Sequence, residues 1–211
     1  MSDAAPACER CLKSQALCVC DDVTPIDNRV EVLIIQHPQE QDVALGTARL
    51  AAQHFRKAQV KVGLSWPSLG KALGRPADPK NWAVLYLGSA KVGGPDKPEV
   101  IALDRKGAIL ADQTKALSGI EGVIVLDGTW AQAKALWWRN AWFLKCRRIA
   151  LNPREPSKYG RLRREARREA VSTLEAVAVL TAHLEKNPEI AATLRGSFDR
   201  MLAKYRAAVP T

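Results

Sequence analysis

Four of the five cysteines fall within thirteen residues, at Cys8, Cys11, Cys18 and Cys20. Four thiolates in the spacing Cys-x2-Cys-x6-Cys-x-Cys can surround a tetrahedral Zn²⁺, and four protein ligands leave no open position for a substrate. We therefore expect a structural zinc ion. The single residue between Cys18 and Cys20 is an unusual spacing, so three alternatives stay open: three cysteines with an outside fourth ligand, a redox-active cluster, and a chance cluster. Cys146 is predicted to be a buried small hydrophobe.

A second group of chemically useful residues follows the apolar run 122–126, where Asp127 and Thr129 precede Trp130. In a parallel sheet, ligands bind at the carboxyl ends of the strands. One interpretation makes Asp127 an acid or base at the floor of a pocket, with the indole as a wall. The alternative is that Asp127 or Thr129 caps the next helix while Trp130 packs against the core.

Three further segments would share that edge of the sheet: Gln36 to Glu40, Leu87 to Ala90, and Leu151 to Arg154. The patterns GxGxxG, GxxxxGK[ST] and GxSxG are missing from the sequence, which argues against a dinucleotide fold, a P-loop and a hydrolase nucleophile. Ser172 and Glu175 form a capping-box pattern, which explains both residues without a ligand.

The elements that must position these residues alternate in type along the chain. Strands are predicted over 30–36, 60–66, 82–88, 122–126 and 148–151, and helices over 43–57, 130–144, from 172 onward and from 188 to about 207. This alternation predicts an α/β fold with a mostly parallel sheet and helices on both faces. The polar segment 21–29 is a predicted linker. We expect a Cys-rich module over 1–28 and a main domain over 29–211.

Length and charge limit the classes of function. The chain has 211 residues, a mass of 23.1 kDa and a net charge of +10, which suits one domain with a small appendage and a polyanionic partner. Ten basic residues, eight of them Arg, lie between 145 and 168 beside two acids. This stretch favours a phosphate-contacting surface over a solvated helix. There is no transmembrane-length apolar run and no signal-peptide pattern, so we expect a cytoplasmic protein without a membrane or obligate protein partner.

Four motifs, in one order, resemble the DTW-domain family, a branch of SPOUT-like enzymes shared with ribosomal-RNA aminocarboxypropyltransferases. They are the paired cysteines, Gln36-His37-Pro38-x-Glu40 followed by Thr47-Ala48-Arg49, Asp127-x-Thr129-Trp130, and Ser172-Thr173-x-Glu175-Ala176. The resemblance implies transfer of the 3-amino-3-carboxypropyl group from S-adenosylmethionine to N3 of a uridine in tRNA, with release of methylthioadenosine. It also implies a SPOUT-like fold and, from kinship alone, a trefoil knot.

The resemblance also implies roles for individual residues. Asp127 is expected to be the catalytic base, or else an anchor for the uracil or the cofactor's amino group. S-adenosylmethionine would contact Leu87, Gly88, Leu126, Thr129, Trp130, Leu151, Asn152, Pro153, Ser172, Thr173 and Glu175. The tRNA would contact Arg49, Arg154, Tyr159, Arg161, Arg163 and Arg164. An S-adenosylmethionine-dependent RNA methyltransferase and a non-enzymatic zinc-ribbon RNA-binding protein are the alternative functions.

Overall fold

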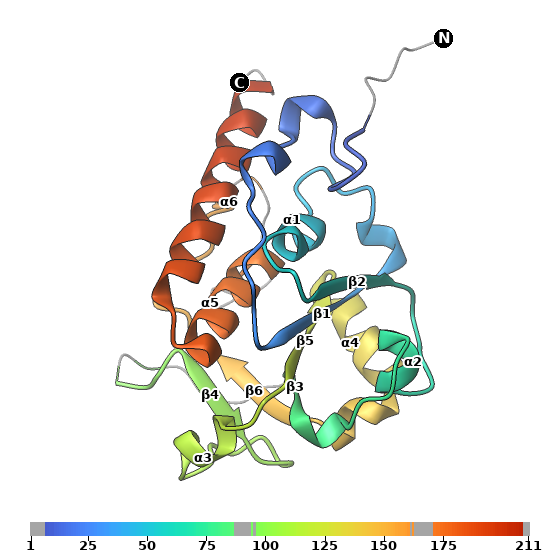
Figure 1. The fold of residues 1–211 in the computed structure, drawn as a ribbon, viewed down its shortest axis with the longest axis vertical. Helices are drawn as coiled ribbons and strands as arrows, with labels where there is room; N and C mark the ends of the chain where they lie inside the picture. The colour runs from blue at the N-terminus through green and yellow to red at the C-terminus, as the bar shows by residue number, and fades with distance from the viewer. Residues whose placement is uncertain (1–6, 87–93, 95, 161, 163–170, 209–211) are drawn as a thin grey trace.

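The computed structural model describes residues 7–86, 94, 96–160, 162 and 171–208 (Figure 1). Six strands form one sheet in the order β2-β1-β5-β3-β6-β4. They are β1 (Glu31–Gln36), β2 (Ala58–Val62), β3 (Trp82–Leu85), β4 (Val100–Leu103), β5 (Gly122–Asp127) and β6 (Arg147–Leu151). Five strands are parallel, and β4 pairs antiparallel with β6 at one edge. The prediction of an α/β fold with a mostly parallel sheet is confirmed.

Helices cover both faces of the sheet, because the central strands are apolar on both sides (Figure 1). On one face, Val32 and Ile34 of β1 pack with α1 (Ala48–Gln53) and α5 (Thr173–Glu185), and α6 (Pro188–Ala208) packs on α5. On the other, Leu33 and Ile35 pack with α2 (Leu69–Leu73), α4 (Trp130–Arg139) and the 3₁₀ helix η5 (Ala141–Lys145). Short α3 (Gln113–Leu117) lies beside β4, and the other 3₁₀ helices are η1 (Gln15–Leu17), η2 (Cys20–Asp22), η3 (Pro38–Glu40) and η4 (Pro79–Asn81).

Three predicted elements differ in extent from those of the structure. The helix expected over 130–144 is α4 at 130–139, followed by the 3₁₀ helix η5. The helix expected over 43–57 spans only 48–53, because the segment before it turns on itself: Gly46 N–H donates to Val43 O at 2.8 Å. The strand expected over 60–66 is β2 at 58–62, and it ends where its partner β1 ends, with Gln36 opposite Val62. The short elements α2, α3 and β4 were not predicted.

The Cys-rich module packs against the rest of the chain. Val19 and Val23 are buried in the same hydrophobic core as α1 and α5. Lys204 of α6 donates from Nζ to the carbonyl of Cys18, and Lys13 donates to the carbonyl of Ala44 at 2.6 Å. The division of the chain at residues 28 and 29 stays a prediction.

The start of β1 is tied to the end of α5, although the two are far apart in sequence. Arg29 Nη2 donates to the carbonyl of Leu184 at 2.9 Å, and Val30 N–H donates to Glu185 Oε1 at 2.6 Å. These bonds fix α5 along the sheet, so its first turn lies at the carboxyl end of the strands. Among the helices of the described residues, none combines the length and apolarity that crossing a membrane requires.

Candidate active site and metal centre

Asp127 is the last residue of β5 and is 5% exposed. Its Oδ2 accepts a hydrogen bond from Nε2 of Gln36 at 2.8 Å, and its Oδ1 accepts one from the hydroxyl of Thr173. Gln36 ends β1 and Thr173 begins α5, so three elements converge on one carboxylate. We call Gln36, Asp127 and Thr173 the strand-end cluster. Two donors that point at the carboxylate stabilise its ionised form and fix its orientation.

The first turn of α5 is held by side chains of this region. Thr47 Oγ1 accepts from the N–H of Leu174 at 3.2 Å, and Ser172 Oγ accepts from the N–H of Glu175 at 3.1 Å. Glu175 completes the capping box by accepting from Ser172 N–H at 2.8 Å. The first-turn amides of Leu174 and Glu175 therefore already have partners inside the protein.

Glu175 also anchors the segment that precedes Tyr159. Its Oε2 accepts from the hydroxyl of Ser157 at 2.7 Å, and its Oε1 accepts from the N–H of Lys158 at 2.9 Å. Tyr159 is buried edge-on against Phe198, and its hydroxyl donates to the carbonyl of Leu45 at 2.5 Å. Glu175 thus holds the backbone of Lys158, and Tyr159 holds the backbone of Leu45 in the segment before α1.

The turn from β5 into α4 is tightly packed. A Cβ atom added to Gly128 would lie 2.9 Å from Cβ of Gln132, so only glycine fits without a shift. Thr129 caps α4 in a capping box with Gln132, which bears out the capping interpretation for this residue. Leu126 is buried in the core under α4, and Trp130 is half-buried at the first position of the helix.

The predicted cofactor residues of β6 lie along the same edge, across β3 from Asp127. Asn152 Nδ2 donates to the carbonyls of Gly94 at 2.9 Å and Lys97 at 3.2 Å, so it holds the loop before β4. Arg154 Nη2 donates to the same Lys97 carbonyl at 3.0 Å. Leu151 ends β6 and Pro153 follows Asn152, and both are half-buried. Leu87 and Gly88 lie outside the described residues.

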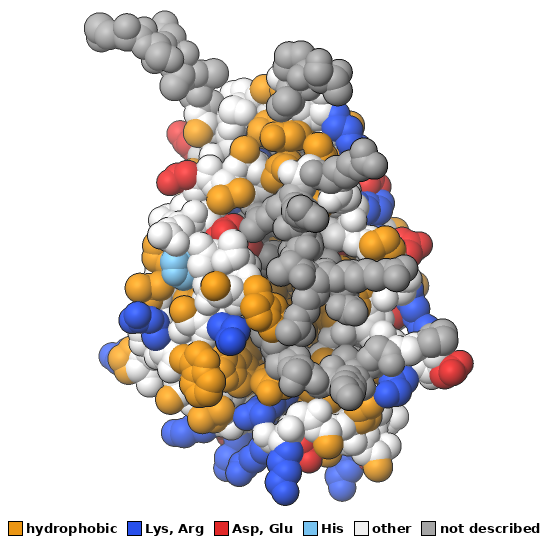
Figure 2. Space-filling model, turned by 180° about the vertical axis from the view of Figure 1, so that it is seen from behind, with side chains coloured by type: hydrophobic (Ala, Val, Ile, Leu, Met, Phe, Trp, Pro, Cys, Tyr) orange, Lys and Arg blue, Asp and Glu red, His pale blue; other side chains and the backbone are white. Residues whose placement is uncertain are grey.

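Several described residues of the basic stretch over 145–168 make contacts within the protein, whereas Lys145 is exposed. Arg147 donates to the carbonyls of Lys80, Ala116 and Ser118. Arg148 lies over the rings of Tyr86 and Trp137, and Lys158 pairs with Asp199 at 2.6 Å. Arg161, Arg163 and Arg164 lie outside the described residues. Figure 2 shows Lys and Arg side chains gathered at the end of the molecule opposite the Cys-rich module.

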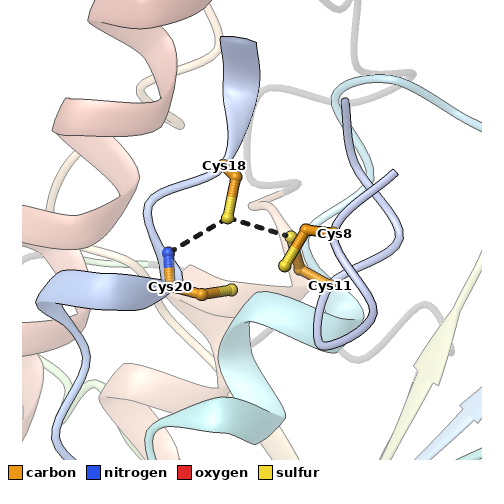
Figure 3. Close-up of side chains that lie close together, drawn as sticks. All are labelled: Cys8, Cys11, Cys18 and Cys20. Atoms are coloured by element: carbon orange, nitrogen blue, oxygen red, sulfur yellow. Dashed lines mark hydrogen bonds between the residues drawn. The ribbon is translucent and has the colours of Figure 1, made fainter. Parts of the chain in front are cut away.

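The four clustered cysteines converge on one point (Figure 3). Their Sγ atoms all lie within 4.8 Å of one another, and the Cys11 and Cys18 sulfurs are 3.8 Å apart. Tetrahedral Zn–S bonds of about 2.3 Å require sulfurs about 3.8 Å apart, so the arrangement fits Zn²⁺. The backbone N–H of Cys20 points at Cys18 Sγ at 3.4 Å. Leu12, directly after Cys11, has a left-handed φ of 59°, which turns the chain back toward the cluster.

The surroundings act differently on the individual thiols. The backbone N–H of Cys11 lowers the pKa of Cys8 to about 7, whereas burial raises the pKa of Cys11 and of Cys20. Burial raises the pKa of Cys146 to about 12. Cys146 is buried and lies far along the sequence from the cluster, as expected for a small core residue.

Comparison with known families gives this arrangement its context. A family model described as the DTW domain matches residues 5–206. The chain belongs to the DTW domain family. This DTW chain is 30% identical over 191 residues to tRNA-uridine aminocarboxypropyltransferase 2 of Macaca fascicularis, and 30% over 194 residues to that of Mus musculus. Each match covers 90% of the chain and 60% of the relative.

A third relative, tRNA-uridine aminocarboxypropyltransferase 2 of Drosophila melanogaster, is 26% identical over 192 residues, which is 89% of the chain and 70% of the relative. The chain thus spans about 60% of the length of the first two relatives. No solved structure matches the chain.

The DTW chain brings together two residues that the sequence analysis assigned to the site, Asp127 and Thr173, and adds two to which it gave no role. Gln36 and Thr47 bond directly to Asp127 and to the first turn of α5. The signal for Gln36 was its position at the end of a buried strand. Thr47 carried no such signal, because its contact depends on where α5 docks.

Proposed function

We propose that this DTW protein transfers the 3-amino-3-carboxypropyl group of S-adenosylmethionine to N3 of a uridine in tRNA. The observation that carries the proposal is the buried Asp127 carboxylate, oriented by donors from β1 and α5 at the carboxyl end of the sheet. The names of the curated relatives, all tRNA-uridine aminocarboxypropyltransferases, support the same reaction class.

The chemistry requires a base, because N3 of uridine carries a proton that it must lose to become nucleophilic. In our proposal Asp127 accepts this proton. N3 then forms a bond to Cγ, the methylene carbon of the methionine part that is attached to the sulfonium sulfur, while the bond from Cγ to sulfur breaks and its electron pair stays on sulfur. Methylthioadenosine leaves. S-adenosylmethionine supplies the electrophilic carbon.

Gln36 and Thr173 are positioning residues in this proposal. Their donors fix both carboxylate oxygens. Asp127 is buried, so little water competes with a substrate for the carboxylate. Leu126, Thr129, Trp130, Leu151, Asn152, Pro153 and Ser172 are proposed to line the cofactor side, with Leu87 and Gly88. Arg49, Arg154 and the arginines after Tyr159 are proposed on the RNA side.

We further propose that the Cys-rich module binds one structural Zn²⁺ through Cys8, Cys11, Cys18 and Cys20. The sulfur separations support tetrahedral coordination. Four protein ligands leave the ion without an exchangeable position, so its role would be to hold the module on α1 and α6. The finer fold assignment, a SPOUT-like domain with a trefoil knot, likewise stays a proposal.

The test is to incubate the zinc-loaded protein with unmodified tRNA and S-adenosylmethionine, digest the RNA, and weigh the nucleosides. A uridine heavier by one aminocarboxypropyl group, together with methylthioadenosine, is the expected result. A methylated nucleoside with S-adenosylhomocysteine would replace the proposal by an RNA methyltransferase. RNA binding without any product and without calorimetric binding of S-adenosylmethionine would favour a zinc-ribbon binding protein.

A further inference from the structure

A groove of about 550 Å³ runs beside the Cys-rich module, where α1 lies between that module and edge strand β2 (Figure 1). Three arginines from three parts of the chain line it, namely Arg10 of the Cys-rich module, Arg49 of α1 and Arg56 just before β2. The other described lining residues are uncharged: Pro25, Ala52, Gln53, Phe55, Ala58 and Val60. We call this feature the arginine groove. It presents three positive charges and no negative one, so it attracts anions.

Two of these arginines have donors that the described part of the chain does not satisfy. The Nε of Arg49 is buried and has no hydrogen-bond partner there. A buried donor without a partner costs free energy, which a bound acceptor would recover. Arg56 is exposed, and its backbone N–H alone is bonded, to the carbonyl of Ile26 at 2.9 Å.

Arg10 is held in place by the Cys-rich module and by α1. Its Nε donates to Gln53 Oε1 at 3.2 Å, and its Nη1 donates to the carbonyl of Cys20 at 2.9 Å. A guanidinium has five N–H donors, so these two bonds leave others for a ligand. Because Arg10 lies between Cys8 and Cys11 and bonds Cys20, the geometry of the cysteine cluster sets the position of its charge.

The arginine groove is linked to the strand-end cluster through Arg49. This residue also lines a second cavity of about 190 Å³, together with Gln36 and Lys13. The amide of Gln36 bonds Asp127. A strand of nucleic acid that leaves the groove past Arg49 would therefore approach the strand-end cluster, whereas Arg56 lies at the amino end of parallel β2, the other end of the strands from Asp127.

We propose that the arginine groove binds the sugar-phosphate backbone of the RNA substrate away from the modified uridine, with the Cys-rich module supplying one of three phosphate contacts. This inference rests on the proposed function, which makes RNA the substrate. Arginine suits the role because its planar guanidinium matches phosphate oxygens in pairs. The described basic residues Arg147 and Lys158 bond within the protein instead. Arg148 also has a buried Nε without a hydrogen-bond partner in the described chain, but its guanidinium lies over the rings of Tyr86 and Trp137.

The experiment measures the Kd of unmodified tRNA, without S-adenosylmethionine, over a series of salt concentrations. The proteins are the zinc-loaded full chain, Arg10→Ala, Arg49→Ala, Arg56→Ala and the control Arg105→Ala. Arg105 is exposed just after β4. Because β4 and β2 are the two outermost strands of the sheet, Arg105 lies at the edge opposite the arginine groove.

Each groove variant is expected to weaken tRNA binding about fivefold and to lower the slope of log Kd against log salt by about one, while Arg105→Ala changes neither. Uridine modification should fall at low tRNA concentration and recover at saturation. Zinc content and far-ultraviolet circular dichroism verify that each variant is folded. Arg56→Glu adds a test at a side chain without contacts in the described chain, and it should weaken binding further than Arg56→Ala.

Three outcomes discriminate. If the groove variants bind tRNA like the wild type while the wild type modifies uridine, the RNA-binding role of the arginine groove is wrong and the proposed function stands. If the groove variants lose salt-dependent tRNA binding while the wild type modifies no uridine, the RNA-binding role of the arginine groove stands and the proposed function is wrong. An equal loss of tRNA affinity in Arg105→Ala would show a general effect of charge and overturn the RNA-binding role of the arginine groove.

Discussion

The four candidate ligands of the Cys-rich module lie within thirteen residues, whereas the members of the strand-end cluster come from positions 36, 127 and 173. In the module, a local turn at Leu12 and the spacing of the cysteines bring the thiols together. In the strand-end cluster, the parallel register of β1 and β5 places Gln36 opposite Asp127, and the docking of α5 adds Thr173. A metal ion is expected to stabilise the first site, and the core of the whole domain stabilises the second.

This difference matters for how each site fails. A local metal site is lost when one ligand or the ion is removed, because metal coordination by all four thiolates is what links them directly. The strand-end cluster survives small changes in its members, because β1, β5 and α5 are fixed by the core. Loss of the ion should therefore act on stability, and changes at the strand ends should act on rate.

Removal of zinc should have the largest effect. Zinc binding to small structural sites contributes about 10 kcal/mol or more, and Val19 and Val23 of the module lie in the main core. We expect Cys11→Ser, or treatment with a strong chelator, to abolish stoichiometric zinc and lower the melting temperature markedly. Metal analysis measures the zinc content, and calorimetry measures the melting temperature. The control variant Cys146→Ala should retain one zinc per chain. Full zinc content in Cys11→Ser would contradict the four-cysteine site.

Asp127→Asn should lower the rate of uridine modification by about 10²- to 10⁴-fold, the usual contribution of a general base. Folding and affinity for S-adenosylmethionine should change little, because the amide has the size of the carboxylate. Single-turnover assays measure the rate of uridine modification, and calorimetry measures the affinity for S-adenosylmethionine. Asp27→Asn, a change at an exposed residue of the segment before β1, is the matched control. Normal turnover in Asp127→Asn would show that Asp127 is not the catalytic base.

His54 lies at the end of α1, and its carbonyl accepts a hydrogen bond from Ile26 N–H at 2.8 Å. It is fully buried, and burial together with the charge of Arg200 lowers its pKa from 6.5 to about 4. The unfolded chain binds a proton below pH 6.5 and the folded chain does not. Stability should therefore fall as the pH drops from 6.5 to 4, by about 3 kcal/mol in total.

Urea unfolding at a series of pH values measures this contribution as the difference between the wild type and His54→Gln. The variant cannot take up the proton, so its stability should depend less on pH in that window. Equal pH dependence in the two proteins would show that His54 is protonated in the folded state.

Thr173→Val should have the smallest effect, a decrease in kcat of about tenfold with an unchanged KM for S-adenosylmethionine. The substitution keeps the shape of the side chain and removes one of the two donors that orient Asp127. Thr173→Ser restores a hydroxyl and should recover most of the rate, which a purely structural role would not require. Without that recovery, the positioning role of Thr173 would be wrong.

Much of the fold follows from apolar runs in the sequence. Runs of β-branched and aliphatic residues mark β1 and β5, which are buried on both faces, and the helical periodicity marks α4, α5 and α6. The antiparallel edge strand β4 has only four residues after Pro98, too short a run to distinguish from a loop. The five-residue helix α2 depends on the Ser68 cap, whose hydroxyl accepts from Lys71 N–H.

The site was less accessible to sequence reasoning. Asp127 could be singled out because it ends a buried strand, and the four cysteines because they are close in sequence. The bond from Gln36 joins residues 91 positions apart, and the bond from Thr173 joins residues 46 positions apart. The arginine groove needs residues from the Cys-rich module, α1 and the start of β2. Such pairings depend on strand order, which a single sequence does not specify.

The docking of α5 also bears on when the protein becomes competent during its synthesis. A ribosome adds about 5–20 residues per second, so Asp127 is made several seconds before Thr173, its partner 46 residues later. Likewise, the residues at the start of β1 can form their bonds to α5 only after Leu184 and Glu185 have been synthesised. Nascent chains arrested before residue 173 therefore lack the hydroxyl that orients Asp127. Only a chain that has been made past Glu185 can assemble the site and tie down β1.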